Sequence, residues 1–323
     1  DYSEAGAEIT NDTAKVFSCP MVLKVEPPSL EQIKLLNPQA LLISALQLKT
    51  QDKKYFEALA AKRITALAFE FIKDEDGTYP AVRSLSEIAG TASVLIASEL
   101  LSNTKNSSGL MFGNISGVPP TEVTIIGAGT VGEFAARSAI GLGANVRVFD
   151  NSITKLRRLQ TNLTTTVYTS TLQPKNLLKA LKRCDVAIGA VRGANRAPVL
   201  VSEEMVESMK NGSVIIDVII DMVGCFETSE VTTHDSPTFT KHGVIHYCVP
   251  NIPARYARTA SVSISNIFTP YLLKIAEDGG IENALRFDRG LKNGLYFYQG
   301  ILTNKSVADW FDLKCSDIYL LIY

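Results

Sequence analysis

The sequence has few histidines and no paired cysteine motif. Its three histidines, His234, His242 and His246, lie in one short stretch of a 323-residue chain, so a zinc site built from several histidines is not expected. We expect His234 in a turn and His246 in the core. The five cysteines are scattered, odd in number and never spaced as CxxC. They predict reduced thiols in a cytoplasmic protein and no disulfide framework.

Net charge and long hydrophobic runs are also lacking. The 32 basic and 33 acidic residues leave a formal charge of −1, which removes the electrostatic case for nucleic acid or an anionic membrane as the main partner. No uninterrupted apolar run approaches ~18 residues, so no transmembrane helix is expected. The 21 glycines and 13 prolines are too few for a fibrous or low-complexity chain. What remains is a packed globular protein whose length suggests about two domains.

Apolar runs alternate with helical stretches in residues 1–85. Strands are predicted at 21–25, 40–44 and 66–70, and a helix at 52–61. Strands separated by helices favour an α/β layer with a mostly parallel sheet. A stretch of small and apolar residues then predicts a buried helix from Ser86 to Leu101, with Ser86 at its start, where it would also suit an N-cap.

The same alternation continues more regularly from Thr121. Strands are predicted at 123–126, 145–149, 165–169, 185–190, 213–220 and 244–248. Helices are predicted at 133–142, 152–163, 175–182, 202–209 and 259–278, followed by a mixed helical tail. This order is typical of a doubly wound parallel sheet.

A glycine-rich motif follows the first strand of this series. The residues Gly127-Ala128-Gly129-Thr130-Val131-Gly132 form G-x-G-x-x-G between a β-branched strand and a helix. Gly127 permits the tight turn, Gly129 lets a diphosphate approach the backbone, and Gly132 lets the helix pack closely on the strand. The motif predicts a dinucleotide site at a helix N-terminus. The alternative is that these glycines only pack a helix on a sheet.

An acidic residue follows the second strand. Asp150 lies 21 residues after Gly129, where a carboxylate can accept hydrogen bonds from the adenosine ribose hydroxyls and repel a 2′-phosphate. This arrangement favours NAD over NADP as cofactor. The nearby Lys155, Arg157 and Arg158 weaken that preference.

Several segments together resemble a known family. They are GAGTVG, CDVAIGAV, SEEMVESMKNGSVIIDV, GCFETSEVTTHDSPTF and HYCVPNIP. They resemble the alanine dehydrogenase branch of the alanine dehydrogenase and proton-pumping transhydrogenase family, over the first residues to about residue 278. The resemblance implies an NAD domain (86–258) inserted in a second α/β catalytic domain (1–85 and 259–323). It also implies a homo-oligomer, usually a hexamer, that oxidatively deaminates L-alanine to pyruvate and ammonia while reducing NAD.

The cofactor residues of the family transfer well to this sequence. Beside the motif glycines, Thr130, Val131 and Asp150, the resemblance implies cofactor contacts from Ser86, Lys155, Val191, Arg192, Val218, Ile219, Ile220, Asp221, Val249, Pro250, Asn251 and Ile252. Most of these residues follow the carboxyl ends of predicted strands, where doubly wound sheets bind ligands.

The catalytic residues transfer less well. Asp221 matches the active-site aspartate, but Met222-Val223-Gly224 replaces the usual Gln-Gly-Gly. The catalytic histidine falls on Gln47, whose amide can hydrogen-bond a substrate but cannot act as a general base.

The substrate-binding side departs from the family as well. The substrate-binding lysine falls on Glu26, and Lys24, on the same strand face, could supply the missing cation. Glu26 could instead pair with Lys24 or bind a second amine. The resemblance implies that the family's N-terminal segment, with a substrate-binding arginine, is absent here. The chain starts at Asp1 and not at Met, so we expect a fragment or a processed start, and no signal peptide is visible.

Three functions remain open at this point. The first is NAD-dependent dehydrogenation of L-alanine or another small amino acid, with Asp221 and Gln47 in the catalytic site and Lys24 and Glu26 holding the substrate. The second is an NAD-binding sensor or scaffold with lost or redirected catalysis. The third is a saccharopine-type dehydrogenase, in which Glu26 would pair with a distal amine.

Overall fold

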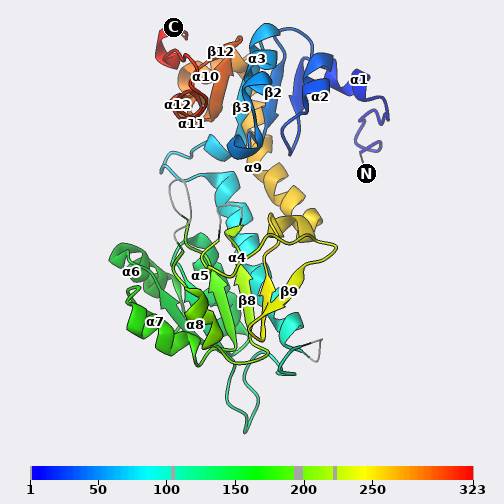
Figure 1. The fold of residues 1–323 in the computed structure, drawn as a ribbon. Helices are drawn as coiled ribbons and strands as arrows, with labels where there is room; N and C mark the ends of the chain where they lie inside the picture. Colours follow the sequence, from blue (N-terminus) through cyan, green and yellow to red (C-terminus); the bar gives the residue numbers. More distant parts are fainter. Residues whose placement is uncertain (1, 103–105, 193–198, 221–223, 323) are drawn as a thin grey trace. The chain divides into compact units, whose positions relative to one another are not determined.

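The chain forms two compact units. The structure, a computed structural model, describes residues 2–102, 106–192, 199–220 and 224–322. Unit 1 comprises residues 1–83 and 264–323, and unit 2 comprises residues 84–263. Both units are α/β with largely parallel sheets (Figure 1), which confirms the predicted fold class.

Unit 1 is built on a five-stranded sheet of order β1-β2-β3-β11-β12. The strands are β1 (Met21–Leu23), β2 (Leu41–Ser44), β3 (Thr65–Ala68), β11 (Leu295–Tyr298) and β12 (Ile301–Leu302). The first three are parallel, whereas β11 pairs antiparallel with both β3 and β12. The predicted helical tail therefore also contains a hairpin, whose Leu-Tyr-Phe-Tyr strand suits a buried sheet position.

Helices cover both faces of this sheet. They are α1 (Thr13–Phe17), α2 (Leu30–Leu35), α3 (Lys53–Ala61), α9 (Ala257–Glu277, whose residues from Ile264 belong to unit 1), α10 (Ile281–Phe287), α11 (Arg289–Gly294) and α12 (Lys305–Phe311). Alternate residues of β2 enter different cores: Leu42 packs with residues of α2, α3 and α12, whereas Leu41 and Ile43 pack with residues of α9, α10 and α11. This two-sided burial follows from the period of two along a strand.

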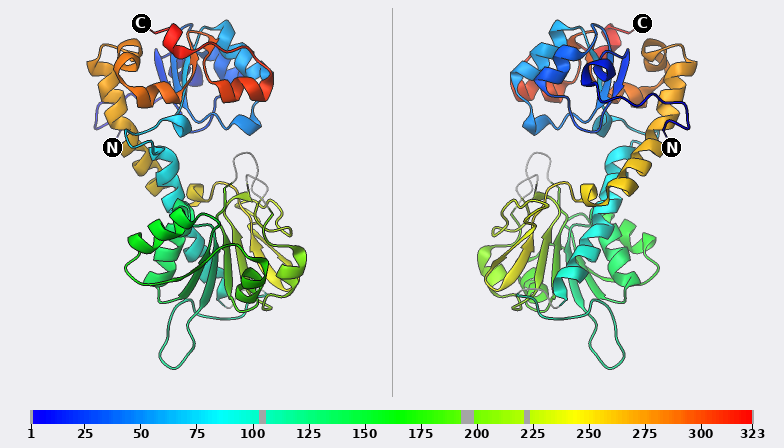
Figure 2. Two further views of the ribbon diagram at one scale, coloured as in Figure 1. Left: turned by 90° about the vertical axis from the view of Figure 1, so that its left-hand side faces the viewer. Right: turned by 90° about the vertical axis from the view of Figure 1, so that its right-hand side faces the viewer.

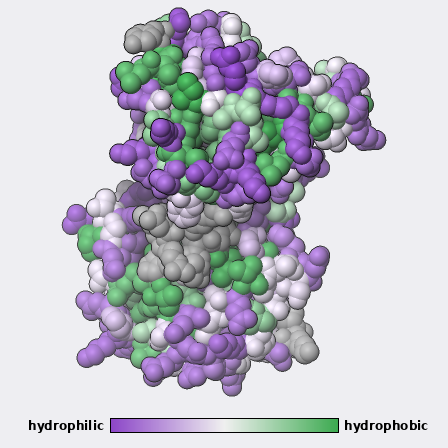
Figure 3. Space-filling model, turned by 45° about the horizontal axis from the view of Figure 1, so that its top comes forward, coloured by the Kyte–Doolittle hydropathy of each residue, from purple (hydrophilic) through white to green (hydrophobic). Residues whose placement is uncertain are grey.

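Edge strand β1 is covered less than its neighbours. Val22 is buried, but Met21 and Leu23 are 38% and 50% exposed, and Val25, which follows the strand, is 57% exposed. Figure 3 shows hydrophobic side chains among the hydrophilic ones at the surface of unit 1. Exposed apolar groups on an edge strand are typical of a surface that takes part in association.

Unit 2 contains a seven-stranded sheet of order β6-β5-β4-β7-β8-β10-β9. The strands are β4 (Glu122–Ile126), β5 (Asn145–Phe149), β6 (Tyr168–Ser170), β7 (Val186–Gly189), β8 (Val214–Asp217), β9 (Thr238–Lys241) and β10 (Val244–Tyr247). All pairings are parallel except that of β9 with β10. The order of the six parallel strands is that of the dinucleotide-binding fold, with its switch point between β4 and β7.

Two helical layers enclose this sheet (Figure 2). The helices are α4 (Pro80–Leu101), α5 (Thr130–Gly141), α6 (Ile153–Asn162), α7 (Pro174–Leu181) and α8 (Glu203–Glu207). Residues of α4, α5 and α6 share one core with Val186 and Ile188 of β7, whereas residues of α7 and α8 share another with Ala187. The central strands are therefore apolar on both faces, as parallel strands between helices must be.

Helix α4 begins earlier than predicted. It starts at Pro80, so Ser86 lies inside the helix and is not its N-cap. A proline at the first turn lacks only an N–H that would have no helical partner, and it fixes a helical φ. By length and composition α4 is the one described helix that could cross a membrane. Its residues Ala92, Ile96 and Ala97 are buried in the unit 2 core, which accounts for its apolar content.

The sheet differs from the prediction at three places. The apolar run 213–220 does not continue as a strand, because β8 ends at Asp217 and the chain turns there. Strand β6 begins at Tyr168, later than predicted. The antiparallel edge strand β9 was not predicted, because its Thr-Phe-Thr-Lys sequence is only partly buried and lacks a long apolar run.

We predict that Gly90 is required for the contact between α4 and α5. A Cβ at Gly90 would lie 2.4 Å from the Val131 carbonyl oxygen and 2.9 Å from the Phe134 Cβ. Gly90→Ala should therefore destabilise the protein by about 1–3 kcal/mol, the usual cost of overpacking. Thermal unfolding measures the effect. The matched control is Gly141→Ala in α5, where a Cβ meets nothing within 4 Å. Equal melting temperatures for the two variants would contradict the prediction.

Candidate active site

The parallel strands of unit 2 end in one row. Their register pairs Ile126 with Phe149 and Gly189, Gly189 with Asp217, and Ile216 with Tyr247. The segments that follow β4, β5, β7, β8 and β10 therefore leave the same edge of the sheet. These segments contain nearly all of the predicted cofactor residues, so the topology brings together what the sequence places up to about 120 residues apart.

The glycine-rich loop has the backbone that the motif predicts. Gly127 has φ +114°, and its Cβ would lie 2.6 Å from the Ala190 carbonyl oxygen after β7. A Cβ at Gly132 would lie 1.8 Å from the Gly127 carbonyl oxygen, so the first turn of α5 packs directly on the loop. Both positions need glycine for contacts inside the protein.

Gly129 differs from the other two motif glycines. It is the N-cap residue of α5 and supplies no side-chain cap to the first turn. A Cβ at Gly129 would meet nothing within 4 Å. The space beside Gly129 is therefore open, and the first-turn N–H groups of α5, at Thr130 and Val131, can donate to an anion. This cradle fits a diphosphate.

Asp150 is buried at the end of β5 and joins two loops. Its Oδ2 accepts a hydrogen bond from the Ala128 N–H at 2.8 Å, and its Oδ1 accepts one from the Ser152 N–H at 2.7 Å. Each carboxylate oxygen keeps further acceptor capacity for a ribose hydroxyl. The structure thus gives Asp150 a role that the motif did not reveal, which is to hold the glycine-rich loop against the end of the neighbouring strand.

One basic side chain near this loop is already engaged. Arg158 donates to the Ala128 carbonyl oxygen at 3.3 Å and lies 3.8 Å from the Glu133 carboxylate. Glu133, buried in the first turn of α5, also pairs with Arg137 at 3.1 Å. Lys155 is exposed in the first turn of α6.

The remaining predicted cofactor residues differ in burial, and of these Ser86 lies in α4 and Thr130 in the first turn of α5. Val218, Ile220, Val249 and Ile252 are buried. The others are half-buried, namely Ser86, Thr130, Val191, Ile219 and Pro250, or exposed, namely Arg192 and Asn251. Asn251 adopts the left-handed conformation with φ 52° at the start of a 3-10 turn. Asp221 lies outside the described residues.

Asp217 is a residue that the sequence analysis missed. It is the last residue of β8, is 0% exposed, and accepts hydrogen bonds from the Cys225 N–H at 2.8 Å and the Ser229 hydroxyl at 2.8 Å. Burial raises the pKa of Asp217 above its ordinary value, against the opposing effect of these hydrogen bonds. The sequence feature that could have identified Asp217 is an aspartate directly after the apolar residues of a strand, as in Val-Ile-Ile-Asp.

The loop of Gln47 in unit 1 is held in a similar way. Gln47 is exposed and has φ 47°. The Glu70 carboxylate, which follows β3, accepts hydrogen bonds from the Leu46 N–H at 2.8 Å and the Gln47 N–H at 3.1 Å. Glu70 was also missed, although it too follows an apolar strand.

The predicted substrate residues lie after β1. Lys24 is half-buried and its ammonium donates to the Pro27 carbonyl oxygen at 3.3 Å. Glu26 is exposed, and the ion pairs of the described residues do not include one between Lys24 and Glu26. The alternative in which these two side chains neutralise each other is thus not adopted.

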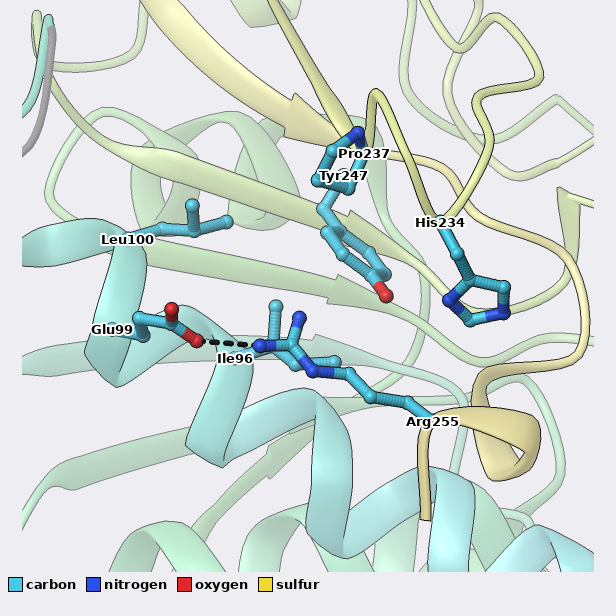
Figure 4. A pocket seen from close by; sticks show the side chains of 7 residues that line it. All are labelled: Ile96, Glu99, Leu100, His234, Pro237, Tyr247 and Arg255. Atoms are coloured by element: carbon cyan, nitrogen blue, oxygen red, sulfur yellow. Dashed lines mark hydrogen bonds and ion pairs between the residues drawn. The ribbon is translucent and has the colours of Figure 1, made fainter. Parts of the chain in front are cut away.

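A pocket of about 330 Å³ lies elsewhere in unit 2. Figure 4 shows its lining residues, Ile96, Glu99, Leu100, His234, Pro237, Tyr247 and Arg255. The Arg255 guanidinium pairs with the Glu99 carboxylate at 2.8 Å across it. None of the predicted site residues lines this pocket, although Arg255 lies in the 3-10 turn that begins at Ile252.

The histidines do not form a site. His246 is fully buried in β10, where its Nε2 lies 2.8 Å from the Thr228 hydroxyl and its Nδ1 lies 3.0 Å from the Val244 carbonyl oxygen. This confirms His246 as a core residue. His234 is exposed in the loop before β9. Among the described residues no group of three or more His, Cys, Asp or Glu could hold a metal ion.

We predict that Gly129→Ala weakens dinucleotide binding without affecting the fold. The added methyl meets no protein atom but enters the space that a diphosphate would occupy, so the Kd for NAD should rise at least about tenfold. Calorimetric titration gives the Kd, and thermal unfolding checks the fold. Gly132→Ala is the comparison, since its methyl collides with the Gly127 carbonyl and should lower the melting temperature. Unchanged NAD affinity in Gly129→Ala would contradict the proposed cradle.

We also predict that His246 makes stability depend on pH. Burial lowers the pKa of His246 from 6.5 to about 4, so between these values only the unfolded chain takes up the proton. The contribution is complete above pH 6.5 and is lost as pH falls toward 4. About 2 kcal/mol should disappear between pH 7.5 and 5. The melting temperature should fall less steeply over this window in His246→Asn than in the wild type or in the exposed control His234→Asn. Parallel slopes for all three would refute the assignment.

Comparison with known proteins identifies the family to which the chain belongs. Residues 1–89 match the family model described as "Alanine dehydrogenase/PNT, N-terminal domain", and residues 93–305 match "Alanine dehydrogenase/PNT, C-terminal domain". The chain is 39% identical over 321 residues to alanine dehydrogenase of Staphylococcus epidermidis, which covers 98% of this chain and 86% of the relative. Alanine dehydrogenase 2 of Staphylococcus aureus matches to the same extent.

Solved structures agree with the sequence matches. A structure named L-alanine dehydrogenase superposes with a TM-score of 0.90 at 34% identity, covering 96% of this chain and 86% of that chain. The transhydrogenase of Sinorhizobium meliloti shares the fold, with a TM-score of 0.78 at 22% identity over 94% of this chain and 85% of that chain. These matches confirm the resemblance deduced from the sequence: the chain belongs to the alanine dehydrogenase/PNT family.

Proposed function

We propose that this protein is an NAD-dependent dehydrogenase that oxidatively deaminates L-alanine to pyruvate and ammonia. The observation that carries the proposal is the near full-length similarity to alanine dehydrogenases. It is supported by a nucleotide cradle at the switch point of the unit 2 sheet. We further propose that the domains have the roles expected from the family, with residues 86–258 holding the nucleotide and residues 1–85 and 259–323 forming the substrate domain.

The residues of unit 2 suit NAD. The open side of Gly129 and the first turn of α5 would receive the diphosphate, and Asp150 would accept hydrogen bonds from the adenosine ribose. The Asp150 carboxylate disfavours a 2′-phosphate, and the nearby Arg158 is engaged by Ala128 and Glu133. NAD, when bound, supplies the acceptor for the hydride from the substrate Cα.

The other residues divide the remaining work. Lys24 would attract the substrate carboxylate, with Glu26 beside it. Asp221, in the loop after β8, would stabilise the iminium that develops on the amino group. Gln47 would hydrogen-bond the substrate but cannot take its proton, because an amide does not titrate. The proton must therefore pass to Asp221 or to water, which predicts slow turnover compared with an enzyme that has histidine there.

The family resemblance also suggests an association state and a location. We propose a homo-oligomer, supported by apolar side chains exposed on both units, such as Leu23 at 50% and Met111 at 75%. We propose a cytoplasmic location, which suits five free cysteines.

A second candidate function rests on Gln47. This residue stands in the position of the family's catalytic histidine, and nothing in its exposed, left-handed position makes it a base. A protein that binds NAD but has lost or redirected its catalysis, as a sensor or scaffold, would show the same features.

We expect NADH to form when the full chain is mixed with NAD and L-alanine at alkaline pH, as followed by NADH absorbance. A panel of other small amino acids and diamino acids runs beside it, with Asp221→Asn as the inactive control. Gln47→His restores an imidazole, which tolerates positive φ, and should raise kcat by up to about 10²-fold. Binding of NAD without turnover by the wild type and by Gln47→His would instead favour the sensor or scaffold.

A further inference from the structure

The loop after β8 is fixed at both ends by one buried carboxylate. Oδ1 of Asp217 accepts a hydrogen bond from the Ile219 N–H at 3.3 Å. Its Oδ2 accepts bonds from the N–H groups of Cys225 and Phe226, at 2.8 and 3.4 Å, and from the Ser229 hydroxyl at 2.8 Å. The donors lie at Ile219 and at residues 225–229, so a single side chain joins these two described stretches of the chain.

Asp217 has no cation beside it in the described part of the chain. It takes part in none of the ion pairs found there, although it is 0% exposed. A buried carboxylate is expensive without partners, and here backbone and hydroxyl donors replace water. Asp217 keeps these hydrogen-bond donors only while Ile219 and residues 225–229 stay in these positions.

Two glycines lie directly against the same carboxylate. Gly224 has φ +83°, and a Cβ there would lie 2.4 Å from Asp217 Oδ2. A Cβ at Gly189 on β7 would lie 3.2 Å from Asp217 Oδ1. The Gly224 N–H also bonds the Ile219 carbonyl oxygen at 3.2 Å, which closes the loop on itself. The chain thus leaves room for Asp217 from two directions.

We propose that Asp217 is a positioning residue for the reaction. Its hydrogen bonds fix Ile219 and residues 225–229, and so position Val218–Ile220, which are expected beside the cofactor. This inference rests on the proposed function. Asp217 itself is assigned no contact with substrate or cofactor. It acts by keeping Val218–Ile220 in one conformation, since small displacements of the groups that hold the reactants are costly in rate.

The matched control lies at the opposite edge of the same sheet. Asp185 precedes β7, is 7% exposed, accepts a hydrogen bond from the Glu122 N–H at 2.9 Å and pairs with Lys210 at 2.7 Å. Asp185→Asn therefore removes a comparably buried carboxylate that also bonds the backbone, but away from the carboxyl ends of the strands. Both substitutions should lower stability, and only one should affect turnover.

The experiment compares Asp217→Asn and Asp185→Asn in the full chain. At a temperature well below both melting temperatures and with saturating NAD and L-alanine, Asp217→Asn should lose about 10²-fold in kcat, while Asp185→Asn keeps the wild-type kcat. Ser229→Ala removes one donor but leaves the charge, so it should give an intermediate loss with the fold intact. Wild-type kcat in folded Asp217→Asn and in Ser229→Ala would overturn the proposal.

Amide hydrogen exchange separates this proposal from the proposed function. If the wild type turns over no amino acid, the proposed function fails, but the loop can still be measured. Exchange at Cys225 and Phe226 should then accelerate in Asp217→Asn and not in Asp185→Asn. Unchanged exchange at these amides would overturn the positioning role whatever the activity.

Discussion

Much of the candidate site depends on one kind of interaction, a carboxylate at or just after a strand end that accepts backbone N–H groups. Asp150 holds the glycine-rich loop in this way, Asp217 holds the loop after β8, and Glu70 holds the loop of Gln47. A carboxylate removed from water must find donors, and the nearest ones are the amides of the loops that leave the same sheet edge. The hydrogen bonds that satisfy these carboxylates therefore fix the three loops, and a binding site needs such fixed loops.

The opposite edge of the unit 2 sheet satisfies its carboxylate differently. Asp185, before β7, accepts one backbone N–H but also pairs with Lys210, which reaches it from solvent. At the carboxyl ends of the strands, Asp150 and Asp217 accept hydrogen bonds from backbone N–H groups instead.

Glycines at several positions leave room that a side chain would fill. Gly127, Gly132 and Gly90 are pressed against backbone carbonyls, which brings α4, α5 and the strands unusually close. Gly129 in the same motif faces open space. The glycines of the motif therefore have two different roles, which the sequence does not distinguish. Gly127 and Gly132 allow close packing inside the protein, whereas Gly129 leaves open space beside the backbone.

The sequence by itself determined the fold class, the family and the position of the glycine-rich loop. Apolar strands alternating with helices, a glycine-rich turn and an acid after the next strand are local patterns. Such patterns can be recognised in a single sequence. Through the resemblance it also predicted that Gln47 and Glu26 stand where the family has a histidine and a lysine. It did not locate the end of β8 or the edge strand β9, because the hydrophobic run 213–220 gives no sign of where the chain turns.

Only the tertiary structure decided what Asp217 and Glu70 do. Their partners lie up to 24 residues away, beyond a turn or in another strand-end loop, and no spacing rule connects a carboxylate to a distant amide. The open face of Gly129 and the blocked face of Gly132 were likewise decided by neighbours that the fold brings up. Hydrogen-bond partners and free space are properties of atoms that meet in three dimensions, whereas composition and periodicity are properties of the chain.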